Sequence, residues 1–453
     1  MRSFAALGFA VAAFFCAALV GTGECFSQET AEEQSMILIQ NVRVFDGKSD
    51  ALRPDLDVLV KGNHIEKIGK KLSAPDGARV LDGGGRTLTP GFIDAHTHLQ
   101  WNLGVFEQFA APIDYQAALS LLEAKNTLMR GFTTIRDVAG SVFGVKRSID
   151  EGIFPGPRIY SGGAALTMTA GHGDMRTVNS LPRLFGGVES EVERIGMCIF
   201  ADGVPEVLTA CRVQFRNGAD FIKVFAGGAV SGMYDPVDIG EYSKEELEAA
   251  VGEAKRWNTY VAVHAYTDKS VRDALEAGAM TIEHANLVSE DTIKLAVKKG
   301  AYISAQTGVF LSPPPESFTP AQKARQKLVA DGLDHMMKMA KKHKAKIGFG
   351  SDMIGSIELK KMQSTEFTNR TKWFSNAEIL RQATSVNGEI LALSGPRNPY
   401  PGKLGVIEEG ALADLLLIQG NPLEDIKLLL NPEENIDLIM KDGTIYKNTL
   451  SEN

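Results

Sequence analysis

The sequence predicts an α/β protein: a (β/α)8 barrel of the TIM type with a small β-sandwich formed from both ends of the chain. Eight apolar strand-like runs alternate with helical stretches in the middle of the chain, which is the pattern of a parallel sheet. Short alternating strands occupy both ends. The length of 453 residues leaves room for a full barrel and a modest second domain.

The first residues have the layout of a secretory signal peptide. Arg2 precedes an apolar run from Phe4 to Val20, and small and polar residues follow up to Gln28. The glycines near this run and its short length argue against a stable membrane span. We therefore expect residues 1–27 to be a signal peptide, with cleavage near Ser27. The protein is expected to be exported, either periplasmic or secreted, with no stable membrane span after cleavage.

The four cysteines show no spacing that suggests zinc binding or nucleophilic catalysis. Cys16 lies within the predicted signal and Cys25 at its edge. Lipidation of Cys25 is an alternative to cleavage after it, although Glu24 fits a lipoprotein signal poorly. Cys198 and Cys211 belong to the mature protein. The sequence leaves open whether they form a disulfide, which an oxidising compartment would permit.

Residues 28–90 are expected to form the first part of the β-sandwich and residues 396–453 the second part. In both parts, short alternating strands lie between glycine-containing turns. Because the two ends of a domain often lie close together, we expect one sandwich. The predicted strands are Ile37–Val44, Leu56–Val60, His64–Ile68, Arg79–Asp82, Ala413–Ile418, Ile436–Met440 and Thr444–Tyr446.

Residues 91–395 carry the eight predicted barrel strands. Glycines that fit helix C-caps precede several of them, namely Gly131, Gly218, Gly278 and Gly300. No glycine-rich dinucleotide fingerprint follows any strand, so a Rossmann-type sheet lacks its main support. The strands are Phe92–His98, Phe132–Val138, Arg158–Gly163, Asp220–Phe225, Tyr260–His264, Thr281–His284, Tyr302–Ala305 and Lys346–Ser351.

The composition narrows the classes of partner. Hydrophobic residues make up 44% and charged residues 23%, which is ordinary for a globular protein. The 48 basic and 56 acidic residues give a formal net charge of −8. The chain lacks the concentrated basic stripe that binding to a phosphate backbone requires. Nucleic acid is therefore not an expected partner, whereas a homo-oligomer is expected.

Candidate metal ligands occur at the ends of several strands. His96 and His98 are two residues apart on a strand, so both imidazoles face one side and can share a metal ion. His264, His284 and Asp352 each end another strand. A lone histidine on an apolar strand is usually a core residue. Here, however, five of the eight strands carry a residue type that ligates metals, and active sites in barrels lie at the C-terminal face.

Lys223 lies within the otherwise apolar fourth strand, where an unpaired ammonium is costly. One interpretation is that the side chain reaches solvent or a carboxylate at the barrel mouth. The other is that desolvation depresses its pKa, which leaves a neutral amine that can react with carbon dioxide and become a bridging carbamate.

Taken in this order, these residues resemble the metal ligands of the amidohydrolase superfamily. The resemblance rests on Gly-Phe-Ile-Asp-Ala-His-Thr-His ending at His98, on Lys223 in strand four, and on Gly-Ser-Asp ending at Asp352. It covers nearly the whole mature chain and implies the branch with two metal ions. By this resemblance, His96, His98 and Asp352 bind the more buried ion, His264 and His284 bind the other, and N6-carboxylated Lys223 bridges them.

The resemblance also implies a cofactor and a mechanism. We expect two divalent metal ions, and histidine with carboxylate ligands suits Zn²⁺, although Mn²⁺ or Co²⁺ would also be accepted. A metal-bridging hydroxide would attack while one ion polarises the substrate carbonyl. Asp352 would accept the proton of that nucleophile and pass it to the leaving nitrogen.

The expected substrate contacts are His172, Tyr266 and Arg136. The segments Gly171–Asp174 and His264–Tyr266 resemble the branch that contains prolidase-like and Xaa-Arg dipeptidases, ochratoxin-hydrolysing amidases and imidazolonepropionase-like proteins. This implies hydrolysis of an amide bond in small molecules, either dipeptides or N-acyl amino acids.

The roles of these contacts are left open. His172 and Tyr266, expected on loops beyond strand ends, would grip a carbonyl oxygen or a carboxylate, or would only orient the metal ligands. Arg136 would bind a carboxylate or would be structural. The alternative functions are opening of a cyclic amide or lactone, a metal-dependent binding protein with a retired active site, and a structural or adhesion role.

Overall fold

The computed structural model describes residues 35–450 of the chain. The predicted signal peptide, residues 1–27, lies outside the described residues. Among residues 35–450, no helix combines the length and the apolar character that crossing a bilayer requires. Cys198 and Cys211 are buried free thiols, so the structure does not pair them.

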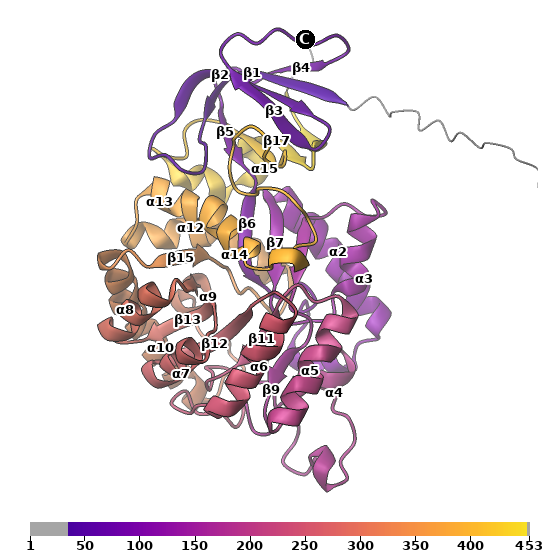
Figure 1. Ribbon diagram of the computed structural model, residues 1–453, viewed down its shortest axis with the longest axis vertical. Helices are drawn as coiled ribbons and strands as arrows, with labels where there is room; N and C mark the ends of the chain where they lie inside the picture. Colours follow the sequence, from indigo (N-terminus) through magenta and orange to yellow (C-terminus); the bar gives the residue numbers. More distant parts are fainter. Residues whose placement is uncertain (1–34, 451–453) are drawn as a thin grey trace, which may run out of the picture. The chain divides into compact units, whose positions relative to one another are not determined.

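Strands from both ends of the described chain form one eight-stranded sheet (Figure 1). Its order is β18-β17-β16-β5-β1-β2-β3, and β4 pairs with β1 beside this path. The two chain ends meet where β5 and β16 pair antiparallel, from Leu415 opposite Pro90 to Ile418 opposite Thr87. The predicted joining of both ends in one β-unit is therefore confirmed.

The bounds of these strands lie close to the predicted ones, except that β5 was not predicted. They are β1 (Met36–Val44), β2 (Arg53–Lys61), β3 (His64–Gly69), β4 (Arg79–Asp82), β5 (Thr87–Pro90), β16 (Leu415–Ile418), β17 (Ile436–Lys441) and β18 (Thr444–Asn448).

Strand β1 changes its parallel neighbour halfway along. Its first half pairs with β4 and its last residues pair with β5. Between them the register with β2 shifts, and Asn41 adopts a left-handed φ of 55°. The bend lets alternate apolar residues of β1 and β16, such as Ile39 and Leu417, pack in one common core, as in a sandwich.

All eight predicted barrel strands are present, in two parallel groups. Backbone hydrogen bonds link the groups at both seams: Asp220 N donates to Ser161 O over 2.8 Å, and Asp352 N donates to His96 O over 2.9 Å. The strands are β6 (Phe92–Thr97), β7 (Phe132–Asp137), β8 (Arg158–Ser161), β11 (Ile222–Phe225), β12 (Val261–Thr267), β13 (Thr281–Leu287), β14 (Tyr302–Ala305) and β15 (Lys346–Phe349).

The third barrel strand is broken in two. After β8 the chain turns at Gly162 and Gly163, where φ at Gly163 is 67°, and continues as β9 (Ala165–Thr167), which pairs with β11. A further short strand, β10 (Cys198–Phe200), pairs with β9. Neither β9 nor β10 was predicted, because each has only three residues.

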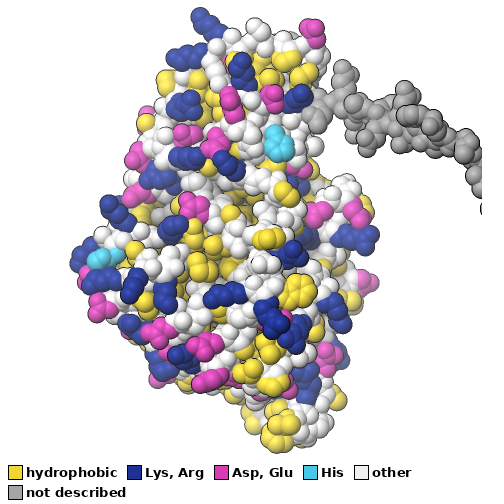
Figure 2. All heavy atoms as spheres, viewed as in Figure 1, with side chains coloured by type: hydrophobic (Ala, Val, Ile, Leu, Met, Phe, Trp, Pro, Cys, Tyr) yellow, Lys and Arg dark blue, Asp and Glu magenta, His cyan; other side chains and the backbone are white. Residues whose placement is uncertain are grey.

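The segment between β9 and β10 contains only η1 (Arg183–Phe185) and α4 (Glu191–Arg194) as regular structure. Apolar side chains lie exposed in it, and Figure 2 shows hydrophobic side chains gathered at the lower end of the view. They are Val178, Leu181, Leu184, Phe185 and Val188.

Helices follow the barrel strands, and several end as predicted. Gly218, Gly278 and Gly300 are left-handed C-caps of α5, α7 and α8. The helices are α1 (Val105–Ala110), α2 (Ile113–Met129), α3 (Phe143–Asp150), α5 (Val204–Asn217), α6 (Lys244–Arg256), α7 (Asp268–Ala277), α8 (Glu290–Lys299), α9 (Gly308–Leu311), α10 (Pro320–Lys342), α11 (Ile357–Lys360), η2 (Lys361–Ser364), α12 (Thr365–Asn369), η3 (Arg370–Lys372), α13 (Asn376–Arg381), η4 (Gln382–Val386), α14 (Asn387–Ala392), η5 (Gly395–Arg397), η6 (Ile426–Leu430) and α15 (Pro432–Asn435).

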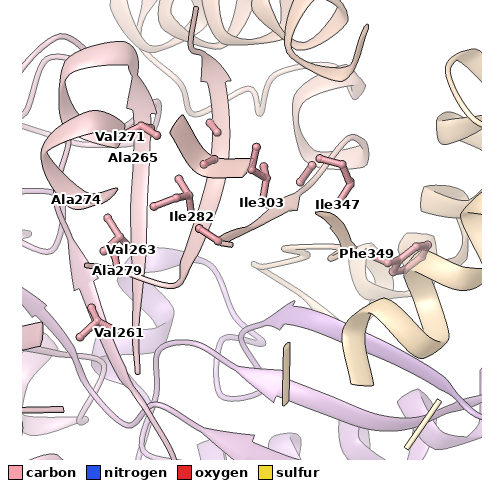
Figure 3. Close-up of a cluster of buried hydrophobic side chains, with 14 of the residues drawn as sticks. Val261, Val263, Ala265, Val271, Ala274, Ala279, Ile282, Ile303, Ile347 and Phe349 are labelled. Carbon is pink, nitrogen blue, oxygen red and sulfur yellow. The ribbon is translucent and has the colours of Figure 1, made fainter. Parts of the chain in front are cut away.

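Residues along the barrel strands alternate between two faces: one packs against the surrounding helices, and the other faces the inside of the barrel. Val261 and Val263 of β12 and Ile282 of β13 belong to the apolar cluster that also holds Val271 and Ala274 of α7 (Figure 3). Residues between these positions have side chains on the opposite face of their strands. Two predicted ligands occupy such positions: His264 lies between Val263 and Ala265 of the apolar cluster, and Lys223 lies between Ile222 and Val224. On β11 and β12, the pattern that builds the core therefore also directs these two side chains into the barrel.

The β-unit packs directly on the barrel. Leu416 and Ile436 belong to the same apolar cluster as Phe92 and Phe132. A Cβ on Gly131, whose φ is 91°, would lie 2.9 Å from Ile436 Cδ1 and 3.1 Å from Leu416 Cδ1. The glycine at this position therefore permits the close approach as well as the turn into β7.

Candidate metal centre

The structure brings the predicted ligands to the C-terminal ends of the barrel strands. His96 lies in β6, Lys223 in β11, His264 in β12 and His284 in β13, whereas His98 and Asp352 follow β6 and β15. His96, His284 and Asp352 have ligand atoms within 4.8 Å of one another. The Nε2 atoms of His96 and His98 lie 3.4 and 3.1 Å from Asp352 Oδ1. Four strands and two loops thus supply one polar cluster.

Several polar atoms of this cluster are buried without a hydrogen-bond partner. Within residues 35–450 these include Lys223 Nζ, His264 Nε2 and His284 Nδ1. The remaining nitrogens of the two histidines, His284 Nε2 and His264 Nδ1, approach to 2.9 Å. An unpaired buried polar atom costs about 1–3 kcal/mol. Imidazoles, a carboxylate and an amine with unpaired atoms together are the donor set of a divalent-metal site, so the residues fit a metal.

The protonation states also suit metal binding. Burial lowers the pKa of His264 and His284 well below the ordinary value, so both imidazoles are neutral, which is the form that ligates metals. Burial alone would raise the pKa of Asp352, but the neighbouring imidazoles of His96 and His98 hold it well below its usual value. Asp352 is therefore ionised and able to ligate a cation.

Lys223 is only 1% exposed. Burial lowers its pKa to about 8, with the positive charge of Arg136 adding to the decrease and Glu283 and Asp352 opposing it. An ordinary lysine titrates near 10.4. The amine of Lys223 is therefore neutral in a far larger fraction of molecules at pH 7 to 8 than that of an exposed lysine.

The backbone is strained within β13 and shortly after β15, at two of the predicted ligands. His284 has φ 75°, Ala285 has φ 56° and Asp352 has φ 55°, which is the left-handed region that residues other than glycine rarely adopt. Each such residue costs of the order of 1–3 kcal/mol, and such strain clusters at functional sites. The Gly-Ser-Asp motif has a steric reason too, because a Cβ on Gly350 would lie 2.7 Å from His96 Cβ.

His172 and Tyr266 pack against ligand histidines. The His172 ring stacks on His264 with centroids 4.7 Å apart, and the Tyr266 ring stacks on His284 at 4.9 Å. His172 lies on the loop after β9, as expected. The expectation that Tyr266 lies on a loop is wrong: β12 pairs with β13 as far as Thr267, so Tyr266 is part of the strand.

Arg136 is completely buried beneath the ligands. Its guanidinium donates to Ala95 O, Tyr260 OH, Thr281 Oγ1 and Glu283 Oε1. These contacts support the structural alternative for Arg136 over binding of a substrate carboxylate.

Three acidic residues near the site were missed by the sequence reasoning. Glu283 Oε2 lies 2.8 Å from His96 Nδ1, Glu241 Oε1 accepts from His172 N over 2.7 Å, and Asp235 Oδ2 lies 3.8 Å from His172 Nδ1. Glu283 left one signal in the sequence, a carboxylate within an apolar run directly before His284. Asp235 and Glu241 left none, since they come from the loop after β11.

Comparison with known proteins now identifies the family. Residues 87–446 match the sequence pattern of the amidohydrolase family. The chain belongs to the amidohydrolase family. This amidohydrolase is 31% identical to ochratoxinase from Aspergillus niger over 377 residues, which cover 80% of this chain and 75% of that protein.

Two solved structures have the same architecture as this amidohydrolase. A prolidase in complex with N-methylphosphonate-L-proline has a TM-score of 0.85 and 32% identity, with 92% of this chain and 100% of that one covered. A Xaa-Pro dipeptidase with bound methionine has a TM-score of 0.78 and 28% identity, with 91% of this chain and 100% of that one covered. These relatives confirm the predicted fold and superfamily, and they make this amidohydrolase a hydrolase of amide C–N bonds.

Proposed function

We propose that this amidohydrolase cleaves the amide bond of dipeptides or N-acyl amino acids and that it uses two divalent metal ions, with Zn²⁺ as the first candidate. The observation that carries the proposal is the convergence of four histidines, Lys223 and Asp352 at one end of the barrel, with unpaired buried atoms among them. The similarity to ochratoxinase and to dipeptidases supports the substrate class.

In this proposal His96, His98 and Asp352 hold one ion, and His264 and His284 hold the other. Lys223 would contribute as a carbamate: its neutral amine would bond to the carbon of carbon dioxide and lose a proton, which would leave an anionic ligand for the ions. The lowered pKa of Lys223 supports this step, because only the unprotonated amine reacts. Ions bound there would polarise the substrate carbonyl and lower the pKa of a water molecule.

The proton and the substrate are handled by side chains of the site. Asp352, whose pKa is held low, accepts the proton of the attacking water and returns it to the leaving nitrogen. Burial raises the pKa of Tyr266 well above its usual value, so its hydroxyl stays protonated. A protonated phenol can donate a hydrogen bond to a substrate carbonyl or carboxylate. His172, with its pKa lowered by burial, is a neutral second contact.

The decisive experiment is a substrate panel on protein stripped of metal and reconstituted with Zn²⁺, Mn²⁺ or Co²⁺. It compares free dipeptides and N-acyl amino acids with amidated dipeptides, cyclic amides and lactones. We expect metal-dependent turnover that favours substrates with a free carboxylate. Equal rates on free and amidated dipeptides, or faster opening of a lactone or cyclic amide, would contradict the dipeptidase proposal.

We also propose that the protein is exported, on the basis of residues 1–27. Mass spectrometry of the mature protein should find its first residue close to Gln28. A mature protein that begins with a lipidated Cys25 would favour the lipoprotein alternative, and an uncleaved N-terminus would contradict export with cleavage.

A further inference from the structure

The barrel interior beneath the metal ligands holds a buried ion pair. Arg136 Nη2 of β7 donates to Glu283 Oε1 of β13 over 2.7 Å, and both side chains are completely buried. The guanidinium also donates to Ala95 O, Tyr260 OH and Thr281 Oγ1, at 2.5, 3.3 and 3.0 Å. Four acceptors on three segments of the barrel therefore hold this one guanidinium in place.

The other oxygen of Glu283 reaches a predicted metal ligand. Glu283 Oε2 lies 2.8 Å from His96 Nδ1, and Thr281 Oγ1 donates to Oε1 over 3.0 Å. A carboxylate only accepts hydrogen bonds, so Nδ1 of His96 carries a proton, and this is the single ring proton in the form that ligates a metal ion. The free nitrogen, Nε2, is then the one that lies 3.4 Å from Asp352 Oδ1, on the side of the other ligands.

The strained backbone of β13 allows neighbouring residues to serve the same site. In a regular strand, adjacent residues such as Glu283 and His284 point to opposite faces. The left-handed φ of 75° at His284 breaks this alternation. Glu283 consequently contacts His96 from below while the His284 ring lies 5.1 Å from the His96 ring.

Stability alone is a poor explanation for such a pair. Desolvation of two buried charges largely cancels their attraction, and apolar replacements of similar volume are often as stable. A second buried pair, Glu366 with Arg370 at 2.8 Å, shows the structural use: Glu366 accepts from the backbone nitrogens of Thr307 and Gly308. One carboxylate oxygen of Glu283 instead accepts a hydrogen bond from the imidazole of His96, a predicted ligand.

We propose that Glu283 and Arg136 are positioning residues for His96: Glu283 fixes the tautomer and the ring orientation of the ligand, and Arg136 holds Glu283 in place. This inference rests on the proposed metal site. Carboxylates that orient ligand histidines typically change metal affinity by about 10- to 100-fold when they are replaced. The pair would thus tune the more buried ion from inside the barrel, without contacting substrate.

The test compares wild type, Glu283→Gln and the matched control Glu366→Gln. Each protein is stripped with a chelator and titrated with Zn²⁺ against a competing chelator, and the bound metal is counted by mass spectrometry. Thermal unfolding of the metal-free proteins measures the structural cost separately. We expect Glu283→Gln to bind one of two Zn²⁺ ions about 10- to 100-fold more weakly. Glu366→Gln should lower the unfolding temperature and keep Zn²⁺ affinity within about 3-fold of wild type.

Two outcomes would overturn the inference: wild-type Zn²⁺ affinity and stoichiometry in Glu283→Gln, or an equal loss of affinity in Glu366→Gln. If Glu283→Gln does not fold, Arg136→Lys gives the answer, since it keeps the charge but loses the forked contacts. Arg136→Lys should weaken the binding of one Zn²⁺ ion by at least about 3-fold. Unchanged Zn²⁺ affinity in this variant would also overturn the inference. Failure of wild type to bind any of Zn²⁺, Mn²⁺ and Co²⁺ would instead refute the proposed function itself.

Discussion

At the scale of single residues, burial and neighbouring charges determine the chemistry that each side chain of this site can perform. Lys223 is the clearest example, because an amine buried in an apolar strand must be paired, neutralised or modified. The structure leaves its Nζ without a hydrogen-bond partner, beside four histidines whose pKa values its charge lowers. Conversion to a carbamate would replace this unpaired buried amine with an anionic metal ligand.

Replacement of Lys223 by alanine should therefore remove metal as well as activity. We expect the bound metal to fall well below two ions and turnover to be lost, with partial recovery when short-chain carboxylic acids are added. Lys441→Ala is the matched control, because Lys441 is also buried but donates to Gly156 O in another part of the protein. Two bound metals and full turnover in Lys223→Ala would contradict carboxylation.

Asp352→Asn should keep the fold and lower kcat by at least about 10²-fold, the usual scale for a lost acid-base group. The carboxylate that faces His96 and His98 is ionised, whereas an amide neither accepts a proton nor returns it. Circular dichroism checks the fold, metal analysis checks the ligand role, and steady-state rates give kcat. Near-normal turnover would remove Asp352 from the mechanism.

Tyr266→Phe should lower kcat/KM for free-carboxylate substrates by about 10- to 100-fold, the scale of a hydrogen bond to a charged group. Metal content should change little, because the phenyl ring can still stack on His284. The control is Tyr160→Phe, whose hydroxyl donates to Asn398 Oδ1 outside the site. Equal losses on free and amidated substrates would favour the alternative that Tyr266 only orients the metal ligands.

Sequence alone could predict which side chains gather at the candidate site, but not the residues that hold them in place. His96, His264 and Asp352 end apolar strands, and the topology of a parallel barrel brings strand ends together. The contact between Glu283 and His96 joins residues 187 positions apart, and it depends on a left-handed backbone at His284. No local pattern reveals either feature, nor the contacts that support the structural alternative for Arg136.

At the scale of elements, strand cores were easier to predict than strand ends. The apolar alternation that identifies β12 stops at His264, yet parallel pairing with β13 carries both strands three residues further, to Thr267 and Leu287. Conversely, Gly162 and Gly163 interrupt the third strand, and the chain resumes as β9. The pattern of apolar side chains shows which residues are buried, whereas backbone hydrogen bonding to the neighbouring strand decides where a strand ends.

The seam between β8 and β11 should make stability depend on pH. Asp220 accepts from Ser161 N and pairs with Lys146, yet burial raises its pKa to about 6. Since the unfolded carboxyl titrates near 3.8, only the folded state keeps this proton between pH 4 and 6. This group therefore lowers stability as pH rises through that window, by up to about 3 kcal/mol.

Asp220→Asn should remove this dependence. In urea denaturation of metal-free protein, the free energy of unfolding of wild type minus that of the variant should fall from pH 4 to pH 6 and then level off. Asp442→Asn is a control of opposite sign, because Arg158 lowers the pKa of Asp442 and the stability it contributes is lost as pH falls. A flat difference for Asp220→Asn would contradict the assignment.

At the scale of the whole molecule, both chain ends complete one sheet that packs on the barrel, and the catalytic end lies among the loops. The segment between β9 and β10 carries several exposed apolar side chains. Val178, Leu184 and Val188 are 85%, 87% and 82% exposed, and Phe185 is 68% exposed. Apolar surface concentrated in this way marks an interaction site, and the expected homo-oligomer would cover it.

The double substitution Leu184→Asp with Phe185→Asp should therefore dissociate the expected homo-oligomer, because two charges in a buried apolar contact are costly. Light scattering coupled to size exclusion measures the mass of each species at micromolar concentration. Ile153→Asp with Phe154→Asp is the matched control, since these neighbours are also exposed, at 69% and 36%, but lie between α3 and β8. We expect the control to keep the wild-type mass and the first variant to run as a monomer. A monomeric wild type would contradict oligomerisation, and an unchanged mass in the first variant would place the interface elsewhere on the barrel.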